Sequence, residues 1–216
     1  MAEKLYHATT GVDEFYYGVL DPSNETVIIK SLPERIKFLQ EISVSSKQEL
    51  AKAFGDNGVA EMATSNGEVE VSGKFHKIPK EDLIEILGLE TTTSGLFAYG
   101  KDDNPPYVAA VFARTYEDGS KEWVGLPKGK FIRPENSSQT KEDSVEFSSD
   151  EITAEFMDRE VKGFNGEKST VFAVTKKGET EARDKLFDAI FGRPYPGAQS
   201  DNEPTEPEEG VTYFED

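Results

Sequence analysis

Residues 104–131, NPPYVAAVFARTYEDGSKEWVGLPKGKF, decide the fold class of this chain. The run Tyr107–Ala113 is almost continuously apolar, which is typical of a central strand buried on both faces. Asp118-Gly119 is a strong signal for a tight hairpin turn. The strand that follows the turn carries large apolar side chains at Trp123, Val124 and Leu126. The stretch therefore predicts an antiparallel hairpin, and it contains no arrangement of side chains that indicates catalysis.

Most of the remaining chain alternates with a period of two, the pattern of strands with one face on a core. In residues 67–77, the side chains of Val69, Val71 and Phe75 share one face and those of Glu68, Glu70 and Ser72 share the other. Aromatic and branched runs at 15–20 and 26–32 flank the turn residues 21–25. Two short helices are expected at 79–88 and 179–192, each ending at a glycine and each lying against a sheet.

The segment 46–66, SKQELAKAFGDNGVAEMATSN, is long for a connection between two strands. A long ordered connection is usually functional or mobile. Two structures are compatible with it. In the first, part of the segment is helical, because Leu50, Ala53 and Phe54 have helical spacing. In the second, the segment forms the two arms of an extended hairpin that turns at GDNG. A further alternative is a lid folded over its own domain.

Composition limits the partners and the chemistry. The 216 residues suit one domain with appendages, and the net charge of −18 argues against a surface that wraps nucleic acid or binds an anionic membrane. The negative charge does not exclude a protein with a channel through which DNA slides without binding. The chain has no cysteine, so thiolate metal sites and disulfides are excluded. We expect no signal peptide or membrane span, and synthesis in a cytoplasm.

The sequence offers no convincing catalytic, cofactor or metal motif. In GFNGEKST (163–170), Glu167 stands where a phosphate-binding loop requires glycine, so a turn is expected there. His7 and His76 are far apart and lack the spacing of a zinc pair. Asp102 and Asp103 are accounted for by turn chemistry. We expect a protein that is not an enzyme and that needs no cofactor or metal.

The order of these elements resembles that of a known family. PPYV leading into the hairpin, KGKF at its end, and KEDSVEFSSDEITAEFMDR (141–159) are similar to the major tail protein, or tail tube protein, of long-tailed siphophages of Gram-positive bacteria. The resemblance runs from about Gly11 to Phe191. It implies a mainly β fold, a two-sheet antiparallel β-sandwich with one or two flanking short helices, a long inter-strand loop and terminal arms. The implied organisation is an N-terminal arm (1–12), a sandwich domain (13–197) and an acidic C-terminal tail (198–216).

The resemblance also implies an assembly. Six subunits form a ring, and stacked rings form the hollow tail tube of the virion, built in the host cytoplasm and used to conduct DNA. The implied partners are further copies of the chain, a tape-measure protein in the lumen, tail terminator and distal tail proteins at the ends, and DNA in transit, with no membrane. Sheet edges that are a liability in a monomer become joints in such a wall.

Two sets of residues are candidates for this role. The N-terminal arm and the segment 46–66 are expected to contact the adjacent ring through Leu5, Tyr6, Leu50, Phe54, Val59 and Met62. The polar faces of the long strands are expected to line the lumen, with Glu41, Ser43, Glu68, Glu70 and Ser72 as candidates, although the same alternation fits an exterior face. The tail 198–216 holds seven acidic residues and no basic residue, which predicts a solvated end in which VTYF is a possible docking element.

One alternative from another class is a soluble β-sandwich module that binds a carbohydrate or a protein. Size distinguishes the two, because a binding module is a monomer near 24 kDa whereas a tube protein forms rings or polymers. An enzyme would require a pair of carboxylates with a pocket between them, assembled by the fold.

Overall fold

The structure is a computed structural model, and it describes residues 7–55, 58–101, 103–134 and 149–197. The larger strands are β1 (Thr9–Asp21), β2 (Asn24–Ile28), β4 (Leu39–Gly55), β5 (Gly58–Phe75), β8 (Val108–Tyr116), β9 (Lys121–Ile132), β10 (Asp150–Met157) and β13 (Val171–Thr175). Short strands are β3 (Glu34–Ile36), β6 (Glu90–Thr91), β7 (Phe97–Ala98), β11 (Arg159–Glu160) and β12 (Glu167–Lys168). The helices are α1 (Lys80–Leu87) and α2 (Glu181–Phe191). The expectation of a mainly β fold with two short helices is confirmed.

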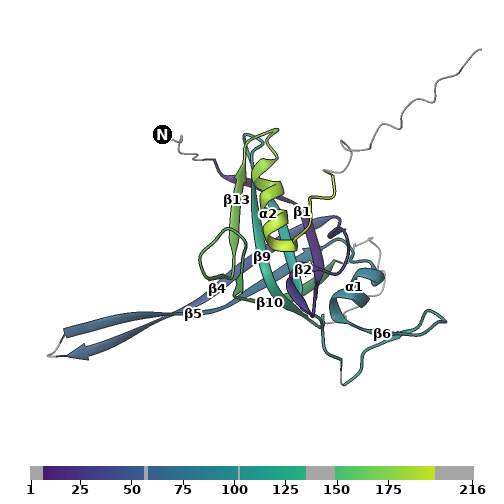
Figure 1. Ribbon diagram of the computed structural model, residues 1–216, viewed down its shortest axis with the longest axis horizontal. Helices are drawn as coiled ribbons and strands as arrows, with labels where there is room; N and C mark the ends of the chain where they lie inside the picture. Colours follow the sequence, from purple (N-terminus) through teal and green to yellow (C-terminus); the bar gives the residue numbers. More distant parts are fainter. Residues whose placement is uncertain (1–6, 56–57, 102, 135–148, 198–216) are drawn as a thin grey trace, which may run out of the picture.

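One large antiparallel sheet organises the molecule, in the order β2-β1-β8-β9-β10-β5-β4. Strand β13 pairs with the first half of β9, from Lys121 to Gly125, and β10 pairs with its second half, from Lys128 to Ile132. The sheet therefore divides along β9 into two layers. Strands β1 and β8 belong to one layer, and β10, β5 and β4 belong to the other, which crosses beneath it in Figure 1.

The space between the two layers is filled by apolar side chains. The rings of Phe15 in β1 and Phe75 in β5 meet edge to face, with their centroids 5.3 Å apart. Strand β1 also contacts β4, which closes the layers over a core that includes Val69, Val71 and Phe131. The sandwich thus arises because a single strongly bent sheet buries one face of each layer against the other.

Strand β8 is central, as its continuous apolar run predicts. Its alternate side chains enter two different cores: Val108, Ala110 and Phe112 face the core between the layers, and Ala109, Val111 and Ala113 face the core under α2. The turn after β8 has Gly119 at φ 80°, and the Ser120 N–H donates to Asp118 Oδ1 at 2.9 Å, which confirms the hairpin turn. Trp123, Val124 and Leu126 are buried, so they serve packing within the subunit.

The two helices cover different parts of the sheet. Helix α2 lies along β13 and β9 and ends at Gly192 in the left-handed conformation (Figure 1). The buried guanidinium of Arg159 donates hydrogen bonds to the carbonyls of Ala189 and Ile190 in the last turn of α2, and burial lowers its pKa to about 10. Helix α1 follows Pro79 and ends at Gly88, and it closes one end of the core between the layers.

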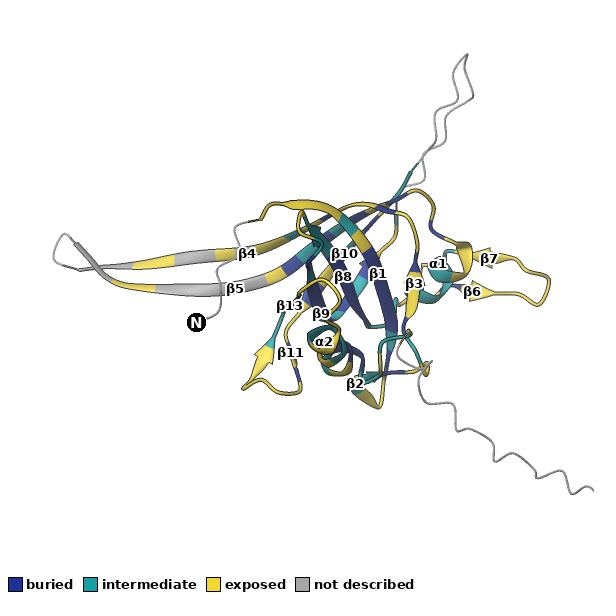
Figure 2. Cartoon of the chain, turned by 90° about the horizontal axis from the view of Figure 1, so that it is seen from above, coloured by how far each residue is buried: buried dark blue, intermediate teal, exposed yellow. Residues whose placement is uncertain are grey.

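The long connection 46–66 is a hairpin, which was one of the structures left open, and the helical alternative is wrong. Strands β4 and β5 pair from Leu39 with Phe75 to Gly55 with Gly58. Beyond Ser46 and Val69 the pair leaves the body and projects far into solvent (Figures 1 and 2). We call the residues 48–66 the projecting arm. Of the expected N-terminal arm, Thr9 and Val12 already pair with β8. The acidic tail and residues 1–6 lie outside the described residues.

Candidate assembly surfaces

The outer face of the lower layer is polar. In β4 and β5 the side chains alternate between the core and solvent, and the candidates Glu41, Ser43, Glu68, Glu70 and Ser72 all occupy the solvent side. Ser43 and Ser72 are direct cross-strand partners, as are Ser45 and Glu70. The structure therefore brings the five candidates together on one surface, which we call the polar face.

The register extends the polar face across two more strands, which the sequence analysis did not include. Glu70 pairs with Glu155 of β10, and Glu155 pairs with Lys130 of β9. Ser72 likewise pairs with Thr153, and Lys74 with Glu151. The period-two pattern of residues 150–157 indicates that these side chains share a face. Only the pairing of β10 between β5 and β9 places that face beside the other two.

Hydrogen bonds and ion pairs fix side chains at the border of the polar face. Ser72 Oγ donates to Glu151 Oε1 at 2.9 Å. Lys130 Nζ donates to Asn104 Oδ1 at 2.7 Å, and Lys128 forms an ion pair with Glu25. Both lysines also lie over the ring of Tyr107. The lysine charges at this border are thus held toward the protein, while Glu41, Glu68 and Glu155 are exposed.

The projecting arm contains four of the residues expected to contact an adjacent ring. Its backbone register pairs Phe54 with Val59, Lys52 with Met62, and Leu50 with Thr64. The side chain of Met62 is 62% exposed. Ala51, Lys52 and Glu61 are also exposed, so these parts of the arm do not cover the sandwich as a lid. Leu5 and Tyr6 lie outside the described residues.

In the described ranges, four strands of the large sheet pair with another strand on one side only: β2, β3, β4 and β13. Two of these edges are β13, which pairs with β9, and β4, which pairs with β5. On β13 the side chains of Phe172 and Val174 are 59% and 48% exposed. An apolar edge strand of this kind invites pairing with another chain. Both edges are therefore candidates for joints between subunits.

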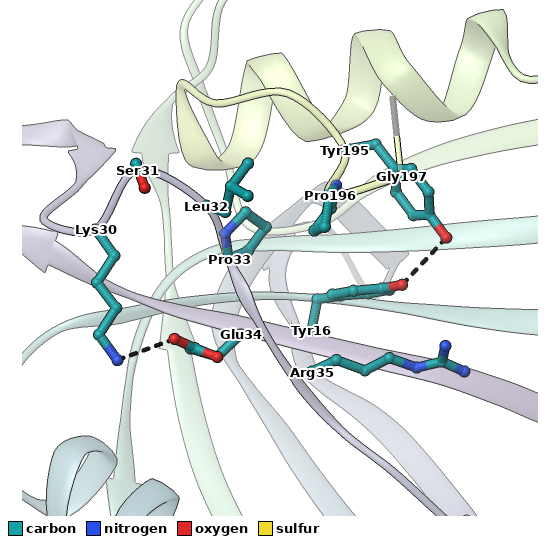
Figure 3. Close-up of a pocket in the computed structure, with 10 residues that line it drawn as sticks. All are labelled: Tyr16, Lys30, Ser31, Leu32, Pro33, Glu34, Arg35, Tyr195, Pro196 and Gly197. Atoms are coloured by element: carbon teal, nitrogen blue, oxygen red, sulfur yellow. Dashed lines mark hydrogen bonds and ion pairs between the residues drawn. The ribbon is translucent and has the colours of Figure 1, made fainter. Parts of the chain in front are cut away.

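A groove of about 720 Å³ lies beside the segment that follows α2, and Figure 3 shows its lining. Residues 30–35 form one wall, Tyr195, Pro196 and Gly197 form the other, and Tyr16 lies at its base. Lys30 Nζ lies 3.1 Å from Glu34 Oε1 and 2.6 Å from Glu85 Oε2. The cation at this rim is compensated from within the subunit, which does not favour the binding-module alternative.

A buried carboxylate lies beside the groove. Glu14, with only 8% of its surface exposed, accepts hydrogen bonds from Tyr16, Tyr195 and Lys121 at 2.7, 3.0 and 2.9 Å. Burial raises the pKa of Glu14, but the hydrogen bonds from Lys121 and Tyr16 outweigh that effect and leave the pKa lowered. Lys121 also pairs with Asp13. This network connects β1, β9 and the segment after α2, so its role is structural.

The contacts of Tyr195 predict where the chain can be shortened. Truncation after Gly197 should change the melting temperature of the unassembled subunit by less than about 2 °C, because Tyr195 stays packed against Tyr16, Trp123 and Phe187. Tyr195→Phe keeps those ring contacts and loses the hydrogen bond to Glu14, at a cost of about 1 kcal/mol. Thermal unfolding of the three proteins measures both effects. A truncated protein less stable than Tyr195→Phe would show that the tail contributes to the fold.

The described part of the chain contains no group of three or more His, Cys, Asp or Glu side chains placed to hold a metal ion. Its helices are too short or too polar to cross a bilayer. What the surface does offer is a polar sheet face, two sheet edges and a projecting arm. Exposed sheet edges and a projecting hairpin are typical of structural proteins that assemble from many copies.

Comparison with known families identifies the class more closely. The family described as phage tail tube protein matches residues 45–194, which span the projecting arm, the hairpin β8–β9 and helix α2. The chain belongs to this family. It is a structural component of the virion tail that assembles with copies of itself and with other tail proteins into a tube. A comparison with curated proteins gave no match.

Proposed function

We propose that six copies of this chain form a ring, and that rings stack into a hollow tube that conducts DNA into the host. The observation that carries the proposal is the polar face. One side of β4, β5 and β10 packs on the core, and the other side is a broad surface of glutamate, serine and threonine. The same face exposes Ile132 and Met157 on β9 and β10, but its glutamates repel phosphate, so DNA passes without sticking.

The projecting arm supplies the contact between rings in this proposal. Its backbone carries Leu50, Phe54, Val59 and Met62 away from the body (Figure 1), and these four apolar residues are proposed to be buried against the adjacent ring. Leu5 and Tyr6 of the N-terminal segment are proposed to join the same contact. The edges of β13 and β4 would join neighbours within a ring, where backbone N–H and C=O groups find partners.

The resemblance to tail proteins supports the remaining parts of the proposal. The tube belongs to a long-tailed siphophage of a Gram-positive host and is assembled in the host cytoplasm. A tape-measure protein fills its lumen before infection, and tail terminator and distal tail proteins close its ends. The domain limits at residues 12 and 197 and the docking of VTYF in the acidic tail also remain proposals.

Electron microscopy of the concentrated purified protein tests the proposal directly. We expect hollow tubes or six-fold rings, and size-exclusion chromatography should show species far above 24 kDa. A protein that stays a monomer at millimolar concentration, with and without a tail-tip or tape-measure nucleus, would refute self-assembly and support the binding module.

The assignment of the polar face to the lumen predicts an effect of charge on DNA passage. Phage that carry Glu68→Lys and Glu70→Lys should assemble tails, because both positions are outside the core. DNA ejection should slow by about tenfold, since each ring then presents rows of cations that bind phosphate. The rate of DNA release after addition of receptor measures the effect, and added salt should reverse it.

The double variant Glu179→Lys and Glu181→Lys is the matched control, because it changes the net charge equally at the start of α2, outside strands β4, β5 and β10 that form the polar face. The control should eject DNA at the normal rate. Equal slowing in both variants, or in neither, would remove the polar face from the lumen.

A further inference from the structure

A head-to-tail stack requires two different surfaces on each subunit, one at each end. The projecting arm is at one end of the long strands β4 and β5. The other end is defined by the pair Leu39 and Phe75, and the residues next to that pair are Phe38 and His76. In Figure 2 this end, followed by α1 and β6, lies across the body from the arm. It is therefore the end that meets the arm of the next subunit if subunits repeat by translation along the strands.

Phe38 is unusual in two independent respects. Its φ of 63° places it in the left-handed region. Among the residues that the structure describes, every other residue with a positive φ is a glycine. A bulky side chain is rarely found there, because its Cβ approaches the backbone. Its side chain is also 71% exposed. The fold thus accepts backbone strain and gains almost no burial of the aromatic ring in return.

A backbone hydrogen bond holds Phe38 in this position. The His76 N–H donates to the carbonyl of Phe38 at 3.0 Å, and the two rings meet edge to face with their centroids 6.4 Å apart. His76 is exposed as well. The result is a pair of aromatic rings that stands outside the sandwich in a fixed orientation. Backbone strain that stabilises nothing inside the subunit is characteristic of residues that belong to a binding contact or a functional site.

We propose that Phe38 and His76 receive the projecting arm of a second copy of this chain in the adjacent ring. The inference rests on the proposed function, since it names the surface that the arm contacts. The exposed thioether of Met62 on the arm is a suitable partner for aromatic rings, because sulfur and ring edges attract each other and methionine adapts to irregular surfaces. An aromatic anchor held in place before binding also loses little entropy when the contact forms.

The substitution Phe38→Gly separates this role from a role in folding. Glycine accepts a φ of 63° without strain, so the melting temperature of the dilute, unassembled subunit should stay the same or rise. Tube formation at a fixed concentration should nevertheless fall at least tenfold, because the receiving ring is lost. Phe38→Asn should behave in the same way, since asparagine also tolerates this conformation.

Phe164→Asn is the matched control, because Phe164 is 49% exposed and lies in the loop between β11 and β12, away from this end. It should form tubes as the wild type does. A photoreactive benzoylphenylalanine at position 38, in tubes assembled from a mixture of isotope-labelled and unlabelled chains, should crosslink to residues 48–66 of a different chain.

The outcomes distinguish this inference from the proposed function. If the wild type forms tubes and Phe38→Gly forms them equally well, or if the crosslink falls outside the arm, the receiving site is overturned and the tube is not. If the wild type forms no tubes under any condition, both are overturned. An equal loss of assembly in Phe38→Gly and Phe164→Asn would also overturn the receiving site, because the effect would not be specific to this end.

Discussion

Replacing residues 49–65 by Asn-Gly should abolish tube formation and leave the subunit folded. The register determines the cut, because Gln48 and Asn66 are direct cross-strand partners and a two-residue turn joins such a pair without distortion. The residues of this range whose burial the structure describes, Ala51, Lys52, Glu61 and Met62, are exposed and belong to neither hydrophobic core. The melting temperature of the dilute subunit should therefore change by less than about 4 °C. Electron microscopy of the concentrated variant should show single rings or monomers in place of tubes.

A second variant separates the length of the arm from its apolar side chains. Leu50→Ser, Phe54→Ser and Val59→Ser combined keep the hairpin length and remove apolar surface, and we expect tubes to be strongly reduced. Lys52→Ser and Glu61→Ser combined form the control on the same strands, and this control should assemble normally. Normal tubes from the shortened protein would contradict the role of the arm. An unfolded shortened protein would show that the arm belongs to the folding unit.

Gly129→Ala should lower the free energy of unfolding by about 1–3 kcal/mol. A Cβ at position 129 would lie 2.5 Å from the carbonyl oxygen of Glu155 and 2.5 Å from Cδ1 of Phe156. The carbonyl belongs to the backbone of β10, and Phe156 is fully buried, so neither can move without separating β9 from β10. Chemical denaturation should show the loss, together with a melting temperature about 2–12 °C lower.

Gly11→Ala is the control for this prediction. Gly11 is also in a strand, β1, and a Cβ there would meet no heavy atom within 4 Å. Because alanine restricts the unfolded chain more than glycine does, this variant should be as stable as the wild type or slightly more stable. If the two variants lost equal stability, close contact at Gly129 would not be the cause.

Local patterns account for the parts of the fold that the sequence predicts well. The hairpin at 107–131 follows from an apolar run, a turn with Asp118-Gly119 and a second apolar run, all within 25 residues of one another. Both helices follow from apolar spacing and a terminal glycine. The common face of Glu68, Glu70 and Ser72 follows from the period of two, because successive side chains in a strand point to opposite sides.

The projecting arm is a part of the fold that local sequence patterns do not predict. A strand pair that leaves the body has no core on either side, so it does not need to alternate between apolar and polar residues. Leu50, Ala53 and Phe54 consequently fit helical spacing as well as they fit a strand, and only the register with β5 decides between them. The turn residues at GDNG were the one local signal that favoured the hairpin.

By itself, the sequence determined the mainly β class, the central strand, the helices and the acidic character of the surface, because each depends on neighbours along the chain. Only the tertiary structure decided that Glu155 and Lys130 extend the polar face of Glu70, since strands far apart in sequence pair side by side. It alone placed Glu14 against Lys121 and Tyr195, and Phe38 in a strained, exposed position. These features depend on register and on long-range packing, and no local pattern of residues encodes them.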